Sequence, residues 1–170
     1  TRVRIRSGQE IITGAFLKSF AVDEVARLLR SEGVTDAVIN AGGSTILALN
    51  DNSHPTWTVN VPHPTEADAG PRKLPISNQC FSLSARANNH LVIDGRAYGH
   101  ILDSRTGLPA ATLQTGVTSA GAFIGDAIST ALFALAEDEM EETASALAHH
   151  FDFEHFRVEG HGGQLHGTCS

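Results

Sequence analysis

Alternating apolar and polar positions recur along the chain, and each such stretch predicts a β-strand. Near the N-terminus Val3 and Ile5 alternate with arginines, and further on Trp57 and Val59 alternate with polar residues. Short apolar runs bounded by turn-forming residues predict strands in the same way. Together these patterns predict strands at residues 3–5, 37–41, 45–49, 57–61, 74–76, 80–84, 91–93, 96–102, 114–120 and 151–158.

Two of these strands meet at the dipeptide Asp94-Gly95. Asp-Gly between apolar stretches is a residue pair that favours a two-residue hairpin turn. Residues 62–72 instead combine Pro, Gly and polar residues, which is typical of a loop. The sequence therefore predicts a hairpin over residues 91–102 and a loop before residue 74.

Apolar residues at helical spacing predict three helices. Val22, Val25 and Leu29 share one face of the first, and Gly33 follows where a left-handed C-terminal cap is favoured. The second helix, at residues 127–136, is nearly all apolar, and the third opens in an acidic segment at residues 137–142 and runs through residue 147. This arrangement predicts an α+β domain with a largely antiparallel sheet and helices packed on one face.

Composition suits a globular protein and argues against several classes of function. The 170 residues, 41% of them hydrophobic, suit one domain over residues 1–170, with a Gly- and His-rich tail at residues 160–170 that is predicted to be flexible. The net charge of −7 and the lack of a basic stripe argue against nucleic-acid binding. No run of about 18 apolar residues occurs, so no membrane span is predicted.

The cysteines and the N-terminus add little about the environment of the protein. Cys80 and Cys169 are too few for a disulfide framework, and Cys80 lies in an apolar run that predicts burial. The chain opens at Thr1 with neither a signal peptide nor a methionine. The cytoplasm is slightly favoured over the bacterial periplasm or a membrane-associated setting.

Residues 13–18 are predicted to form a small-residue turn between a strand and a helix. Such a turn exposes backbone groups to a ligand, and Lys18 would offer a cation near a helix N-terminus, where anions are favoured. An ordinary turn with a surface lysine explains the same residues, and the pattern alone favours that interpretation.

Paired glycines, Gly42 and Gly43, interrupt an apolar strand. Glycines at such a place mark a close approach by a ligand or by another backbone segment. A simple β-bulge explains them equally well.

A polar turn within residues 98–109 follows a histidine that is predicted to lie inside a strand. His100 could hydrogen-bond a ligand or take part in proton transfer. Asp103 could instead close the turn by accepting hydrogen bonds from backbone amides. Functional and structural interpretations are evenly balanced for this segment.

Asp126 and Thr130 are four residues apart, so they lie one above the other on a helical face. A carboxylate and a hydroxyl are hard oxygen ligands of the kind that magnesium takes, alongside waters or phosphates. The alternative, which the pair alone slightly favours, is that Asp126 caps the helix and Thr130 bonds back to a carbonyl. The other histidines show no ligand spacing typical of zinc.

In their order along the chain, these segments resemble the flavin-transferase (ApbE) family. The resemblance runs from about residue 11 to about residue 135 and covers only the C-terminal part of the family's usual length. Ile12, Leu17 and Ser19 stand where the family has Asp, Ala and Gly, and Ala85 and Ser104 stand where it has Gly and Pro. The matching motifs are GAFLKSFAVD at residues 14–23, VINAGGS at 38–44, HILDSRTGLP at 100–109 and DAISTAL at 126–132.

The resemblance implies a T-fold-like domain that uses FAD and Mg²⁺ and transfers the FMN moiety of FAD to a Thr or Ser of an acceptor protein, releasing AMP. It implies that the metal is held by the backbone carbonyl of Ala15 and the side chains of Asp126 and Thr130. The implied catalytic residues are His100 and Asp103. The implied FAD-binding residues are Lys18, Asp23, Gly42, Gly43, Ser84, His100 and Ile101.

Other functions stay open beside this one. The chain could be a degenerate, non-catalytic ApbE-like binding or assembly module, an FAD hydrolase that yields FMN and AMP, or a site for another nucleotide. The partner implied by the resemblance is an acceptor flavoprotein. A separate N-terminal chain or a homodimer would supply the part of the family's length that is missing here.

Overall fold

The centre of the structure, a computed structural model, is an antiparallel β-sheet. Residues 3–10, 14–86, 90–94, 96–103, 105–159 and 165–166 are described. Within them the sheet has six strands in the order β1-β2-β5-β8-β9-β10, and every neighbouring pair is antiparallel. The strands are β1 (Ala37–Ala41), β2 (Thr45–Leu49), β5 (Cys80–Ala85), β8 (Gln114–Ser119), β9 (Phe153–Val158) and β10 (Leu165–His166).

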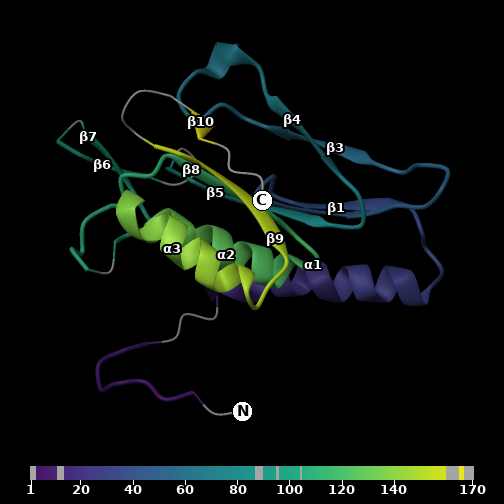
Figure 1. Ribbon diagram of the computed structural model, residues 1–170, viewed down its shortest axis with the longest axis horizontal. Helices are drawn as coiled ribbons and strands as arrows, with labels where there is room; N and C mark the ends of the chain where they lie inside the picture. Colours follow the sequence, from purple (N-terminus) through teal and green to yellow (C-terminus); the bar gives the residue numbers. More distant parts are fainter. Residues whose placement is uncertain are drawn as a thin grey trace.

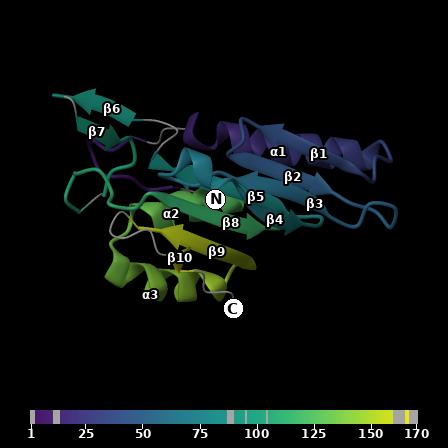
Figure 2. The same cartoon turned by 90° about the horizontal axis from the view of Figure 1, so that it is seen from above.

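Helices cover one face of this sheet, and a hairpin covers part of the other (Figure 1). The helices are α1 (Gly14–Ser31), α2 (Ala122–Ala134) and α3 (Glu137–Ala148). The covering hairpin pairs β3 (Trp57–Val61) with β4 (Arg72–Ile76), and a short 3₁₀ turn, η1 (Ala67–Ala69), lies between them. A second hairpin, β6 (His90–Ile93) with β7 (Arg96–Gly99), projects beyond the end of the sheet (Figure 2).

The two central strands, β5 and β8, are buried on both faces. All six residues of each strand are buried. Since alternate side chains point to opposite faces, both faces of these strands must be covered. Toward the helices, Cys80 packs with α1 and Val117 packs with α2 and α3. Toward the β3–β4 hairpin, Phe81 and Leu83 join a third cluster. The apolar runs in these strands thus reflect a sheet enclosed between two layers.

Glycines allow close packing at two points of this core. A Cβ on Gly116 of β8 would lie 2.2 Å from the ring of Phe156 and 2.9 Å from the ring of Phe81. A Cβ on Gly125 of α2 would lie 2.5 Å from the Ser119 hydroxyl oxygen and 2.9 Å from that of Ser82. Real Cβ atoms do not approach other atoms so closely, so both positions require glycine.

Most predicted elements are confirmed to within a few residues. The predicted ranges 37–41, 45–49 and 57–61 coincide with β1, β2 and β3, and the Asp94-Gly95 hairpin forms as β6 and β7. Gly33 has a φ of 80°, as expected of a left-handed cap, and its amide donates to the carbonyl of Arg30. Helices packed on one face of an antiparallel sheet are confirmed as well.

Several boundaries differ from the predictions. Residues 3–5 are not a strand: Val3 and Ile5 are 74% and 48% exposed, and no neighbouring strand pairs with them among the described residues. Residues 14–18 belong to α1 and not to a turn, because the helix begins at Gly14. In addition, β4 begins at Arg72, inside the predicted loop, and α2 begins at Ala122, five residues before the predicted start.

The predicted strand at residues 96–102 is also too long, since β7 ends at Gly99. His100 therefore follows the strand, and Leu102 forms an isolated bridge with Pro109. Residues 11–13, directly before α1, lie outside the described residues. So does most of the tail from residue 160, in which Leu165–His166 pair with β9 as β10. Within the described part, no helix has the length and apolar character needed to cross a bilayer.

The packing at Gly116 gives a prediction about stability. Gly116→Ala should lower the free energy of unfolding by about 1–3 kcal/mol, because the new methyl group overlaps the Phe156 ring. Urea denaturation followed by circular dichroism measures the change. Gly14→Ala is the control, since a Cβ there meets nothing within 4 Å. Equal stability of the Gly116 and Gly14 variants would contradict the tight packing.

Cys80 gives a prediction about reactivity. Burial, together with the negative charges of Asp23 and Asp126, raises the pKa of its thiol to about 12. Because the thiolate is the reactive form, iodoacetamide at pH 8 should leave Cys80 unmodified in the folded protein and modify it in denaturant. Peptide mass spectrometry reads out the site, and rapid alkylation of Cys80 without denaturant would show that the strand opens.

Candidate functional site

Lys18 lies in the first two turns of α1 and contacts the hairpin between β1 and β2. Its Nζ donates a hydrogen bond to the Ser44 hydroxyl at 2.5 Å. Nearby, the first turn of α1 contains no acidic residue, so the partial positive charge of the helix N-terminus adds to that of Lys18. This corner of the molecule therefore favours an anion.

Gly42 and Gly43 form the turn of that hairpin. Both have positive φ, 69° and 74°. With Ser44 they form the three-residue connection between Ala41 of β1 and Thr45 of β2, so they lie between two strands and not inside one. Asn40 steadies the turn, because its side-chain oxygen accepts a hydrogen bond from the Gly43 amide at 2.8 Å. A Cβ on either glycine would meet nothing within 4 Å, so backbone conformation requires glycine here.

Ser84 connects the sheet to α2. Its hydroxyl lies 3.0 Å from the Ser129 hydroxyl and 3.2 Å from that of Thr130. Ser129 also donates to the carbonyl of Asp126 at 3.1 Å. Asp126 lies one turn inside α2 and is half-buried, so the alternative that it caps the helix is wrong.

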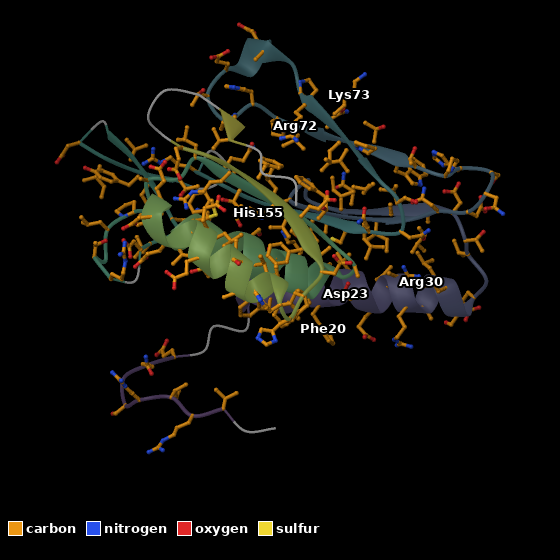
Figure 3. The ribbon with its side chains drawn as sticks, in the orientation of Figure 1. Phe20, Asp23, Arg30, Arg72, Lys73 and His155 are labelled. Carbon is orange, nitrogen blue, oxygen red and sulfur yellow. The ribbon has the colours of Figure 1, made fainter. Side chains whose placement is uncertain are left out.

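Asp23 caps α2 instead. Its two carboxylate oxygens accept hydrogen bonds from the amides of Ala122, at 2.7 Å, and Phe123, at 2.9 Å. Gly121, the residue preceding α2, makes no side-chain cap of its own, so a carboxylate from α1 takes that role. Figure 3 labels Asp23 on the middle part of α1. Both oxygens of Asp23 are thus engaged in holding the two helices together.

The loop after β7 is fixed by a charged cluster. The Asp103 carboxylate accepts hydrogen bonds from the backbone amide of Arg105, at 2.9 Å, and from its guanidinium, at 3.1 Å. The other arm of Arg105 donates to Glu139 of α3 at 2.9 Å. Hydrogen bonds from Arg105 hold the pKa of Asp103 below its usual value. Asp103 thus closes the turn, as the structural interpretation predicted, and a carboxylate with a lowered pKa is a weak base.

His100 and Ile101 precede this cluster. His100 is exposed and half of Ile101 is buried, and the Ile101 carbonyl accepts a hydrogen bond from the Ala110 amide at 3.0 Å. The segment begins beside the end of β5, since a Cβ on Gly99 would lie 3.4 Å from the Arg86 side chain. Gly99, directly before His100, therefore lies near the end of β5 that carries Ser84.

The oxygen atoms suggested for a magnesium ion fit in part. Asp126 offers a carboxylate and Thr130 an exposed hydroxyl on the same face of α2. Ala15 lies inside α1, where a carbonyl points along the helix toward an amide one turn on. In the described ranges no group of three His, Cys, Asp or Glu side chains could hold a metal ion. Such a set suits only an ion that takes its remaining ligands from water and phosphate.

Contacts join the first, second and fourth motifs into one region. Lys18 contacts Ser44, whose carbonyl accepts the Leu83 amide at 2.8 Å, and the adjoining Ser84 contacts α2. Sequence reasoning did not single out Ser44 as a ligand contact, nor Ser129. A hydroxyl inside the apolar segment of α2 was the available signal for Ser129.

Known proteins resemble this chain over most of its length. The sequence profile of the ApbE family matches residues 2–153. The FAD:protein FMN transferase of Klebsiella pneumoniae (strain 342) is 33% identical over 131 residues, covering 75% of this chain and 40% of that protein. The protein of the same name from Escherichia coli (strain K12) is 28% identical over 129 residues, covering 74% of this chain and 36% of the other. The chain thus spans less than half the length of these relatives.

Solved structures share the fold. The ApbE protein of Thermotoga maritima superposes with a TM-score of 0.82 at 22% identity, covering 95% of this chain and 52% of the other. The apo form of Pseudomonas stutzeri flavinyl transferase ApbE gives a TM-score of 0.70 at 22% identity, covering 91% and 48%. Since the family profile matches most of the sequence, the chain belongs to the ApbE family.

Proposed function

We propose that this domain takes part in transferring FMN from FAD to a Thr or Ser hydroxyl of an acceptor protein, with release of AMP and with a requirement for Mg²⁺. Family membership and the relatives named FAD:protein FMN transferase support the reaction class. The observation that carries the proposal is the line of contacts from Lys18 through Ser44 and the end of β5 to Thr130. A cation and several side-chain oxygens in one region support the proposal.

The pyrophosphate of FAD would bind beside Lys18. Lys18 and the N-terminus of α1 supply positive charge, and phosphate oxygens accept hydrogen bonds from both. The N-terminus of α2 cannot serve in the same way, because the Asp23 carboxylate already occupies its first amides. The charges therefore favour α1 as the phosphate-binding helix, and Asp23 contributes by fixing α2 next to it.

Asp126 and Thr130 would hold the metal, with the carbonyl of Ala15 as a third oxygen. A magnesium ion there would neutralise negative charge on the two phosphates as the bond between them breaks. Ser84 holds the Thr130 hydroxyl from the sheet side at 3.2 Å. The position of Thr130 is thus set by the core rather than by a surface loop.

In the transfer itself, the acceptor oxygen forms a bond to the phosphorus of the FMN moiety, and the bond from that phosphorus to the AMP oxygen breaks. The hydroxyl proton must leave as the new bond forms. Asp103 is poorly suited to take it, because Arg105 lowers its pKa and occupies its oxygens. We therefore assign Asp103 to holding the loop in place. His100 and Ile101 would contact the flavin nucleotide, and His100 is the candidate for proton transfer.

Magnesium dependence tests the metal ligands. Wild-type protein should bind FAD more tightly when Mg²⁺ is present, and Asp126→Asn should lose that gain while keeping its fold. Calorimetric titration of the full chain with FAD, with and without Mg²⁺, measures both. Asp138→Asn is the matched control, since Asp138 is an exposed carboxylate at the start of α3. A magnesium effect that survives Asp126→Asn would remove this residue from the metal site.

The role of Lys18 is tested against the second lysine of the chain. Lys18→Met should weaken FAD binding by about 1.5–3 kcal/mol, the size of a hydrogen bond to a charged group. Lys73→Met removes the same charge from β4, on the other side of the sheet, and should leave the affinity unchanged. Equal losses from both variants would indicate a general charge effect rather than a phosphate contact.

The product distinguishes the remaining alternatives. Covalent FMN on a Thr-containing acceptor indicates transfer, whereas free FMN with AMP indicates hydrolysis by water at the same site. FAD binding without either product, or no binding at all, would favour a non-catalytic binding or assembly module. Mass spectrometry of the acceptor together with chromatography of the nucleotides separates these outcomes.

A further inference from the structure

A cavity of about 430 Å³ lies between α3 and β9, on the helix side of the sheet. One face of α3 lines it, and Phe153 and His155, two apart on β9, line it from the sheet. Figure 3 labels His155 on β9 above the helices. None of its residues belongs to the candidate flavin site, the region from Lys18 and Ser44 to Ser84 and Thr130. The size of the cavity suits a small organic molecule.

The lining of this cavity divides into an apolar part and a polar part. Ala144, Ala148 and Phe153 provide the apolar part, and Phe153 also packs against the cluster formed by α2 and α3. The polar part consists of side chains that can accept hydrogen bonds, one of which is a carboxylate. Its residues are Glu141, Ser145, His149 and His155.

His149 presents a hydrogen-bond acceptor. Its Nδ1 lies 2.7 Å from the carbonyl oxygen of Ser145. A carbonyl only accepts, so Nδ1 carries the proton, and in the neutral ring Nε2 keeps its lone pair. That nitrogen is suited to an N–H donor from a ligand.

His155 has a polar atom that the protein leaves unsatisfied. Its Nε2 is buried and has no hydrogen-bond partner in the described part of the chain. Burial lowers the pKa of His155, although the charge of Glu141 opposes the change, so the ring is neutral near pH 7. Because this nitrogen has almost no accessible surface, a ligand in the cavity cannot reach it, and His155 lines the cavity with its other atoms.

The charge of the cavity has one sign. Among the residues that the structure describes, Glu141 is the one carboxylate in the lining, and no Lys or Arg belongs to it. Glu137, Asp138 and Glu142 on the same helix are exposed and add negative potential. Because no metal-binding group of three acidic, His or Cys side chains exists among the described residues, the lining suits an organic cation rather than a metal ion.

We propose that this cavity binds a small protonated organic amine. Its ammonium group would be held by the Glu141 carboxylate and by Nε2 of His149. Its apolar body would pack on Ala144, Ala148 and Phe153. The ligand class follows from a lining that combines hydrogen-bond acceptors and one carboxylate with apolar side chains.

Three probes of the same shape test the charge requirement. Phenethylamine, 2-phenylethanol and phenylacetate share a phenyl body and carry a positive, a neutral and a negative head. Titrations of the full chain at pH 7.5 and low salt, followed by NMR signals of the His149 and His155 rings, should saturate with phenethylamine. The alcohol should bind at least roughly tenfold more weakly, the size of a lost charge-assisted contact, and phenylacetate should cause no shift.

Variants of α3 test the location. Glu141→Gln should weaken phenethylamine binding by roughly tenfold, whereas Glu142→Gln, which removes an equal charge one residue away and outside the cavity, should change it less than about twofold. Ala148→Leu should abolish binding by filling the cavity, and melting curves confirm that each variant is folded. Equal effects of the two glutamine variants, binding that survives Ala148→Leu, or no preference for the amine would each overturn the proposal.

Discussion

The carboxylate of Asp23 fixes the arrangement on which the candidate site depends. It belongs to α1, yet it satisfies the first two amides of α2, a helix preceded by glycine that has no cap of its own. A cap supplied from another helix sets the distance and the orientation between the two. Lys18 on α1 and Asp126 on α2 are therefore positioned by an interaction that neither of them makes.

Close packing beneath α2 completes this arrangement. Gly125 lets the helix approach the sheet until the hydroxyls of Ser82 and Ser119 leave no room for a side chain. At that distance Ser84 reaches both Ser129 and Thr130. The central strands thus present small hydroxyl side chains to α2, whereas their other face carries large apolar side chains. These hydroxyls form hydrogen bonds with polar side chains of α2.

Charge separates the two regions that the structure suggests for ligands. The candidate flavin site has one of the two lysines of the chain and the N-terminus of α1. The cavity beside α3 is lined by one carboxylate and two imidazoles, and the first turn of α3 carries three acidic residues. Anionic ligands would thus favour the candidate flavin site, and cationic ligands would favour the cavity, although the whole protein has a net charge of −7.

The sequence alone determined the order of the elements and most of the strands. Short apolar runs predicted β1 and β2, alternation predicted β3, and Asp94-Gly95 predicted the β6–β7 hairpin, because these signals are local. The sequence-based prediction failed at residues 3–5, where alternation occurs without a partner strand in the described part of the chain. It also failed at residues 14–18, where small residues begin a helix and do not form a turn. Propensity is weak at such ends, and tertiary contacts decide them.

For the site, the sequence supplied the motifs but not their contacts. Family resemblance named Lys18, Asp23, Asp103, Asp126 and Thr130 as candidates. Only the tertiary structure showed that Asp23 caps α2 and that Arg105 holds Asp103 against α3. It also brought Ser44 to Lys18 and Ser84 to Thr130. Hydrogen bonds between residues far apart in the chain depend on how helices pack on the sheet, and that packing leaves no periodic signal in the sequence.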